Sequence, residues 1–330
     1  MNTLRRFVVI LLLPVLAGFP VLSLPGCSPN KNPTSRRTIA GMIFQEDQFF
    51  RLVLFGMRDA AKRNGVELLE ANSLGKPDKE IQLINTYIAN KVDAIIVSPL
   101  SAQASISALS RARDKGITVI TYNTTVESDI PASFVESDQV GLGASTGRAA
   151  REYIEKHLGG KANIAILAFL SNAPEQSNMR TSGFKSEVTR LPGVRIVAEQ
   201  DAWMPEAAVK KAGDILTANP DVNIIFAANE GGTIGAVLAV KNAGRADRVK
   251  VFGTDMGEQL TDFLLSGDNI LQAITAQQPF AMGTKAVESA LAVLDGKVVE
   301  KNVALPGILL TRERPEEVRK FKQELKQLIN

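Results

Sequence analysis

The sequence predicts an α/β fold made of two doubly wound lobes of parallel sheet. Short apolar runs alternate with helical segments throughout residues 38–294. The runs are continuously apolar, as in Ala94–Val97, which is typical of parallel strands covered on both faces. The strands are also too many for one compact sheet, although no flexible linker divides the chain. We therefore expect two lobes joined by short crossings, with a ligand cleft between them.

The first half of the alternation predicts a sheet with helices between its strands. Gly65 and Gly116 end two of the helical segments. Strands are predicted at Thr38–Phe44, Val66–Glu70, Val92–Val97 and Ile117–Tyr122, and helices at Phe49–Asn64, Asp78–Asn90 and Ala102–Lys115.

The same rhythm restarts after Asp138 and predicts a second sheet. Helices are predicted at Val140–His157, Glu175–Arg190, Glu206–Thr217, Gly231–Asn242 and Phe280–Leu294, and strands at Ala162–Phe169, Val194–Glu199, Val222–Ala227, Val249–Gly253 and Ile270–Thr275.

The segment 313–330 predicts a separate amphipathic helix. Val318, Phe321, Leu325 and Leu328 fall on one face, with Lys and Glu elsewhere. Packing against its own domain and binding a partner are both compatible with this pattern.

Residues 1–26 have the pattern of a secretory signal peptide. Arg5 and Arg6 precede an apolar stretch that runs to Leu24. A membrane-spanning anchor is the alternative, because the stretch approaches the roughly 20 residues that a bilayer requires. The sequence Leu24-Pro25-Gly26-Cys27 resembles a bacterial lipobox, in which the cysteine is lipidated after cleavage. This favours an exported protein held at a membrane by lipid on Cys27, with residues 27–37 as a flexible tether.

Composition and motifs exclude several functional classes. The 38 Lys and Arg residues nearly balance 35 Asp and Glu, unlike the concentrated basic face of a nucleic-acid binder. One Cys and one His exclude intrachain disulfides and thiolate zinc cages and disfavour histidine-based triads. The glycines from Gly141 to Gly147 have the wrong spacing for a dinucleotide fingerprint and indicate close helix packing instead. We therefore expect no enzyme activity, cofactor or metal.

Several segments occur in the order and spacing of type I periplasmic binding proteins. They are Val92–Pro99, Glu136-Ser137-Asp138, Arg180–Phe184, Ile225–Glu230, Gly253-Thr254-Asp255 and Ala276–Pro279. Over roughly residues 38–310 the chain resembles the ribose-type sugar-binding branch of that family. The resemblance implies two lobes that close on a sugar by bending at a hinge of three crossings. It assigns residues 38–137 and 278–305 to the first lobe, and 138–277 and 306–312 to the second.

By position, the resemblance implies a cleft lined by ten residues. They are Asp47, Phe49, Phe50, Asn123, Thr124, Arg180, Trp203, Asn229, Asp255 and Gln277. Planar amide, carboxylate and guanidinium groups match pairs of sugar hydroxyls, while aromatic rings cover C–H faces.

Each class of cleft residue also has a structural alternative. The two phenylalanines could belong to the core, Trp203 could pack on the surface, and Arg180 could be a solvated helix charge. Asn229 and Asp255 directly follow apolar strands, where turn or helix-capping roles are common.

One departure from the family pattern concerns the ligand. Many sugar-binding members carry an Asp-Arg pair after the fourth strand, where this chain has Asn123-Thr124. This difference favours a ligand other than ribose: a modified sugar, a polyol or another small hydroxylated molecule.

The resemblance implies a monomeric solute-binding protein that delivers a sugar or polyol to the permease of an ABC importer. A sensor that presents its ligand to a membrane receptor or kinase is an alternative that the sequence leaves open. A sugar-responsive transcription regulator shares the fold but needs a helix-turn-helix before Thr38, where the sequence has only the apolar run and the tether. We therefore expect no nucleic-acid partner.

Overall fold

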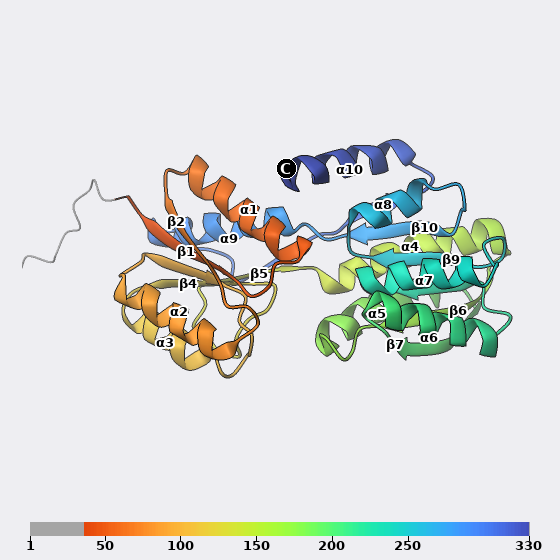
Figure 1. Ribbon diagram of the computed structural model, residues 1–330, viewed down its shortest axis with the longest axis horizontal. Helices are drawn as coiled ribbons and strands as arrows, with labels where there is room; N and C mark the ends of the chain where they lie inside the picture. Colours follow the sequence, from red (N-terminus) through yellow and green to blue (C-terminus); the bar gives the residue numbers. More distant parts are fainter. Residues whose placement is uncertain (1–35, 330) are drawn as a thin grey trace, which may run out of the picture. The chain divides into compact units, whose positions relative to one another are not determined.

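Two six-stranded sheets organise the protein (Figure 1). The computed structural model describes residues 36–329. The first sheet has the strand order β11-β5-β4-β3-β1-β2, and all its pairs are parallel. The second has the order β12-β10-β9-β8-β6-β7, and only β12 is antiparallel to its neighbour. The second sheet thus repeats the strand order of the first.

The first lobe surrounds the first sheet with helices on both faces. Its strands are β1 (Thr38–Ile43), β2 (Glu67–Asn72), β3 (Ala94–Val97), β4 (Thr118–Tyr122), β5 (Ser133–Ser137) and β11 (Asn302–Leu305), and its helices are α1 (Gln48–Arg63), α2 (Pro77–Ala89), α3 (Ile106–Asp114) and α9 (Pro279–Leu294). Successive residues of a strand face opposite sides. Accordingly Ile39 packs with α1 and α9, whereas Ala40 packs with α2 and α3.

The second lobe has the same layered construction. Its strands are β6 (Lys161–Ala168), β7 (Gly193–Asp201), β8 (Ile224–Ala227), β9 (Lys250–Thr254), β10 (Leu271–Ala276) and β12 (Ile308–Thr311), and its helices are α4 (Gln139–Leu158), α5 (Pro174–Val188), α6 (Pro205–Ala218), α7 (Glu230–Asn242), α8 (Glu258–Leu265) and α10 (Pro315–Ile329). One face packs against α4 and α5, and the other against α6, α7, α8 and α10. The predicted class of two doubly wound α/β lobes is confirmed.

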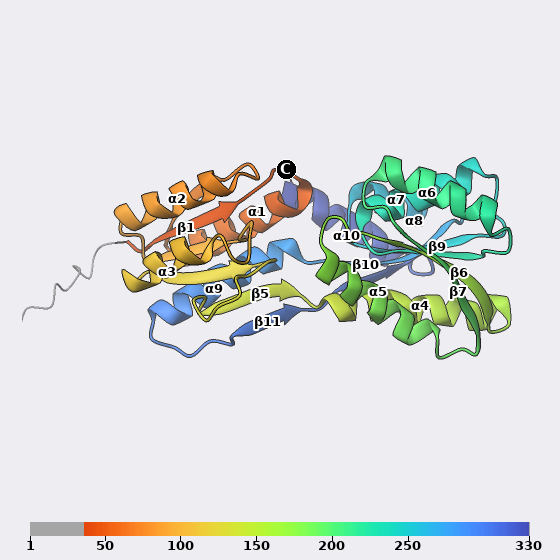
Figure 2. The ribbon, with the colours of Figure 1, turned by 90° about the horizontal axis from the view of Figure 1, so that it is seen from below.

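Three chain segments connect the two lobes. They run from β5 to α4, from β10 to α9 and from β11 to β12. Figure 2 shows these connections between the two lobes.

Close helix packing fixes the position of α5 against α4. A Cβ on Gly143 would lie 1.9 Å from the carbonyl oxygen of Arg180, and a Cβ on Gly183 would lie 2.2 Å from that of Val140. Neither position therefore has room for a larger side chain. The interpretation of the glycines from Gly141 to Gly147 as a helix-packing feature is confirmed at Gly143 and Gly147, and this packing sets where Arg180 lies.

The C-terminal helix α10 packs on its own lobe and also reaches the other. Val318 and Leu325 are buried in the core of the second lobe. The same cluster contains Leu52, which comes from α1 of the first lobe and is 1% exposed. Figures 1 and 2 both show the end of α10 approaching the beginning of α1.

Some elements differ from the sequence expectation. The strands β5, β11 and β12 and the short helix α8 were not predicted, and α3 begins at Ile106 rather than Ala102. The antiparallel pairing of β12 departs from the expected all-parallel sheet. The predicted signal peptide, Cys27 and all but the last two residues of the predicted tether lie outside the described residues. Within 36–329, the structure contains no helix that is both long enough and apolar enough to cross a bilayer.

Candidate functional site

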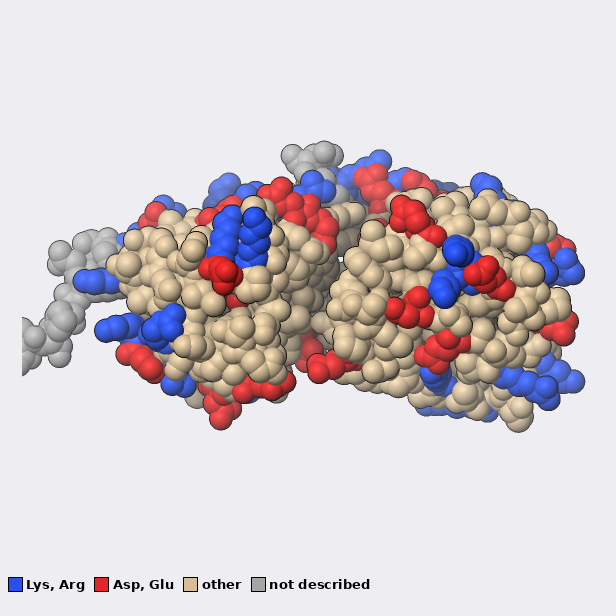
Figure 3. Space-filling view, turned by 60° about the horizontal axis from the view of Figure 1, so that its bottom comes forward, with Lys and Arg blue, Asp and Glu red and all other residues tan. Residues whose placement is uncertain are grey.

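A cavity of about 780 Å³ lies between the two lobes, within the size range of small-molecule sites (Figure 3). All ten residues predicted from the sequence are among its lining residues. Asp47 follows β1 and Asn123 follows β4 in the first lobe, while Asn229 follows β8 and Asp255 follows β9 in the second. The cavity thus lies at the carboxyl ends of strands, where open α/β sheets bind ligands.

The first-lobe wall begins at the N-terminus of α1. Asp47 caps this helix, because its Oδ1 accepts a hydrogen bond of 2.9 Å from the backbone nitrogen of Phe50. Phe49 is half-buried, whereas Phe50 is 4% exposed and packs against Phe44 and Tyr122 in the core. Phe50 therefore supports the wall from the core, and Phe49 has the more accessible ring.

Asn123 and Asp255 occupy equivalent places in the two lobes. Each follows the fourth strand of its sheet, and each backbone nitrogen donates to the neighbouring strand, at Val135 and Thr275 respectively. Both then turn with positive φ, 58° at Asn123 and 80° at Asp255. This conformation is uncommon outside glycine, although Asn and Asp adopt it more readily than most residues. Two of the five non-glycine residues with positive φ in the described part of the chain thus line the cavity.

Arg180 is 3% exposed and is held by three groups of its own lobe. Its Nε donates to Gln139 at 2.7 Å, and its Nη1 donates to the carbonyl of Ala228 at 2.9 Å and to the carboxylate of Asp255 at 3.2 Å. Its guanidinium also lies over the ring of Phe169. A guanidinium has five N–H donors, and Nη2 has no hydrogen-bond partner among the described residues. Two donors of Arg180 thus remain available at the cavity.

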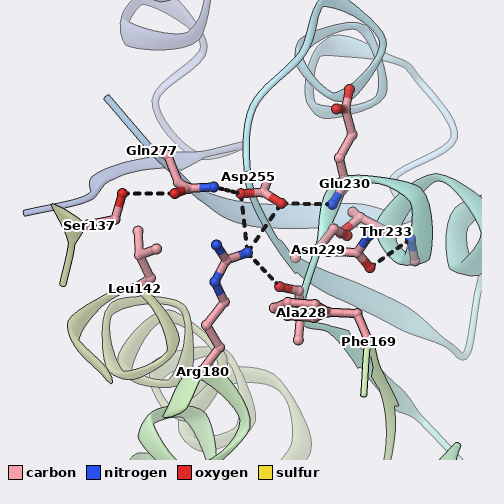
Figure 4. Close-up of polar contacts among 12 residues, drawn as sticks. Ser137, Leu142, Phe169, Arg180, Ala228, Asn229, Glu230, Thr233, Asp255 and Gln277 are labelled. Carbon is pink, nitrogen blue, oxygen red and sulfur yellow. Dashed lines mark hydrogen bonds and ion pairs between the residues drawn. The ribbon is translucent and has the colours of Figure 1, made fainter. Parts of the chain in front are cut away.

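The network around Arg180 extends into the hinge (Figure 4). The side-chain amide of Gln277 donates to Asp255 and accepts a 2.7 Å hydrogen bond from Ser137. Ser137 ends β5 at the first crossing, and Gln277 follows β10 at the second. Asp255 also accepts from the backbone nitrogen of Glu230. The floor of the cavity and two crossings are therefore parts of one hydrogen-bonded system.

Asn229 combines a capping role with a place in the cavity wall. Its side-chain oxygen caps α7 by accepting a 3.2 Å hydrogen bond from the backbone nitrogen of Gly232. The helix-capping role that the sequence offered as an alternative for Asn229 is therefore present. Its Nδ2 donates to the carbonyl of Trp203 at 2.9 Å. One amide hydrogen and one lone pair remain for a ligand. Trp203 itself is 38% exposed and is one of the residues that line the cavity.

Sequence reasoning missed several cavity residues, of which Gln176 and Glu230 are the most informative. Gln176 of α5 donates to the carbonyl of Asn123 at 3.2 Å, so it joins the second lobe to the first. Glu230 begins α7, directly after the predicted Asn229. Burial and the carboxylates of Asp255 and Asp47 raise the pKa of Glu230 to about 7. Its adjacency to a predicted cleft residue was the available signal.

Residues 36–329 contain no group of three or more His, Cys, Asp or Glu side chains that could hold a metal ion.

The arrangement can bind a small polar molecule on all sides. Amides, carboxylates and one guanidinium come from both lobes, together with aromatic rings. The matching sequence family is the periplasmic binding protein domain, over residues 42–298. The chain belongs to this family.

Known members of the family align with most of the length of this periplasmic binding protein. It is 31% identical to the ABC transporter periplasmic-binding protein YphF of Escherichia coli, over 83% of this chain and 86% of the relative. It is 28% identical to a xylitol-binding protein of Mycolicibacterium smegmatis, over 87% of this chain and 80% of the relative. A solute-binding protein of Actinobacillus succinogenes with bound D-allose is 28% identical, with a TM-score of 0.75, over 86% of this chain and all of that one.

Proposed function

We propose that this periplasmic binding protein captures a sugar or sugar-like polyol in the cavity between its lobes and delivers it to an ABC permease. The observation that carries the proposal is the cavity, in which donors and acceptors from both lobes surround one volume. A sugar loses hydrogen bonds to water on binding, so nearly every hydroxyl needs a protein partner. The relatives named for xylitol and D-allose support a ligand of this class.

Capture in such a cavity depends on closure. A ligand that contacts Asn123 on one lobe and Arg180 on the other binds the closed arrangement better than an open one. It therefore shifts the population toward closure by its differential affinity. A permease that recognises the closed pair of lobes then receives only loaded protein. A dissociation constant near 1 μM, about −8 kcal/mol, suffices for this cycle.

Export and anchoring are part of the proposal. The chain is delivered outside the cytoplasm by its signal peptide, and lipid on Cys27 holds it at a membrane as a monomer. The resemblance of Leu24–Cys27 to a lipobox supports the lipid anchor.

A thermal-shift screen tests the ligand class. The protein from Ser28 onward is exposed to pentoses, hexoses, sugar alcohols and inositols. A ligand at a hundred times its dissociation constant should add about 2.7 kcal/mol of stability. Arg180→Ala serves as the matched control, because it should show a smaller shift with the same compounds. The absence of a shift across the whole panel would contradict the proposal.

A further inference from the structure

The charged groups that line the cavity do not balance. Three carboxylates are present, those of Asp47, Glu230 and Asp255, but Arg180 is the only basic lining residue among the described residues. Arg180 already forms an ion pair with Asp255. Within residues 36–329, Asp47 and Glu230 thus remain without a cationic partner.

Glu230 is the less compensated of these two carboxylates. Asp47 caps α1 and accepts hydrogen bonds from the backbone of Phe50 and the side chain of Gln45. The carboxylate of Glu230, in contrast, has neither a hydrogen bond nor an ion pair with any described residue. The N-terminus of α7 offsets only part of its charge.

A buried hydrogen-bond donor near Glu230 also has no partner among residues 36–329. The carboxylate lies over Gly257, where a Cβ would be 2.1 Å from Glu230 Oε1 and 3.9 Å from Gln48 Oε1. Gln48 belongs to α1 of the other lobe, and its amide nitrogen is buried without a hydrogen-bond partner in the described part of the chain. An unused acceptor and an unused donor, one from each lobe, therefore line the same part of the cavity.

The electrostatic state of Glu230 agrees with this charge imbalance. Burial is the main cause of its raised pKa of about 7, and the charged groups that act on it, Asp255 and Asp47, raise it further. A positive group beside the carboxylate would favour its ionised form.

We propose that the ligand is an amino-substituted sugar or polyol, whose ammonium group binds between Glu230 and Asp47 while its hydroxyls bind the groups around Arg180. This inference rests on the proposed function and specifies the ligand class of the same cavity. The same charge excess disfavours ligands with a carboxylate or phosphate. The hydroxyls of a neutral ligand can donate hydrogen bonds to Glu230, but they leave its negative charge without a counter-charge when closure removes the remaining water.

Matched ligands in which an amine replaces one hydroxyl test the inference. The probes are D-glucose with D-glucosamine, D-galactose with D-galactosamine, and D-glucitol with 1-amino-1-deoxy-D-glucitol. N-acetyl-D-glucosamine controls for the size of the substituent, and D-glucuronate supplies a negative charge. Calorimetric titration should show the amine of a binding pair about ten-fold or more tighter than its neutral partner, because ion-paired hydrogen bonds are the stronger class.

Two variants assign the effect to Glu230. Glu230→Gln removes its charge, and Gly257→Ala displaces its carboxylate with the charge retained. Both should reduce the preference for the amine to about three-fold or less. Glu258→Gln is the control, since Glu258 is also a first-turn glutamate but is exposed and outside the cavity lining. The preference of the parent for 1-amino-1-deoxy-D-glucitol should also rise between about pH 6 and 8, as Glu230 ionises.

The outcomes separate this inference from the proposed function. Tighter binding of amines that depends on Glu230 supports both. Neutral compounds that bind as well as their amines overturn the inference and leave the proposed function standing. Binding of none of the compounds, in this panel and in the wider sugar screen, overturns both.

Discussion

Arg180 has two roles at the residue scale, because its buried guanidinium both closes a hydrogen-bond network and leaves Nη2 for a ligand. Truncating it removes the donor and leaves Asp255 without its ion pair. We expect Arg180→Ala to weaken ligand binding by about 1–3 kcal/mol, with little change in fold. Arg180→Lys keeps the charge but loses the planar fork, so it should restore only part of the affinity.

Titration calorimetry and circular dichroism of the two Arg180 variants measure these effects. Asn229→Ala should also cost about 1–3 kcal/mol of binding, through its unused amide groups. Unchanged affinity in Arg180→Ala and Asn229→Ala together would show that the ligand binds elsewhere.

Glu230 makes stability depend on pH. Its usual pKa of 4.5 is raised to about 7 in the folded protein. Between these values the folded chain retains a proton that the unfolded chain has released, so this contribution to stability is lost as the pH rises through about 7. Glu230→Gln should therefore be more stable than the parent near pH 8, by about 1–3 kcal/mol, and similar to it near pH 4.5.

Denaturant unfolding at several pH values checks this expectation for Glu230. A stability difference that stays constant from about pH 5 to 8 would rule out the raised pKa as its cause.

At the element scale, the close contact between α4 and α5 determines the position of Arg180. A Cβ at Gly143 would meet the Arg180 carbonyl itself, and backbone cannot move aside as a flexible side chain can. We expect Gly143→Ala to reduce stability by about 1–3 kcal/mol through overpacking. It should also weaken binding, because α5 must shift and carry Arg180 with it.

A control separates packing from helix propensity. Gly213 of α6 has open space around its Cβ position, so Gly213→Ala should be neutral or stabilising. Equal effects of the two substitutions, measured by thermal unfolding and by titration, would contradict the contact-based explanation.

The sequence predicted the long helices and also the short strands that are apolar throughout, such as the four-residue β3 and β8, and it missed short elements without such a continuous run. In β5 buried and half-buried positions alternate, unlike the continuous burial of β3 that identifies a central parallel strand. The strands β11 and β12 have four residues each, and α8 has eight, too few to establish a period. The antiparallel direction of β12 follows from a crossing that does not reverse the chain: β11 ends at the cleft edge of the first sheet, and after residues 306–307 the chain runs on into the second lobe, away from the cleft. No local sequence pattern encodes this direction.

The sequence predicted which residues line the candidate site more completely than it predicted the contacts among them. Polar residues after apolar strands, such as Asn123 and Asp255, identified the cavity because the strand ends converge there. The cross-lobe bond from Gln176 and the burial of Glu230 depend on how the lobes face one another. Those relations involve residues far apart in the chain, so periodicity and spacing do not carry them.

Export and anchoring are predictions at the scale of the whole molecule. If Cys27 carries lipid, the protein should be found with membranes and should be released by Cys27→Ser. A single acyl chain binds membranes only marginally, and stable anchoring needs a second chain or another signal. Fractionation of cells that produce the two forms provides the measurement. Retention of Cys27→Ser in the membrane fraction would indicate an uncleaved apolar anchor instead.

Leu52 has a thermodynamic consequence for the molecule as a whole. Its side chain starts in one lobe and is buried in the core of the other, beside the C-terminal helix. Neither lobe can melt without exposing apolar surface that belongs to its neighbour. Heat should therefore unfold residues 36–329 in one cooperative transition, with matching calorimetric and van't Hoff enthalpies. Leu52→Ala, at a cost of about 2–5 kcal/mol, should uncouple the two halves into separate transitions, so that ligand protects them unequally.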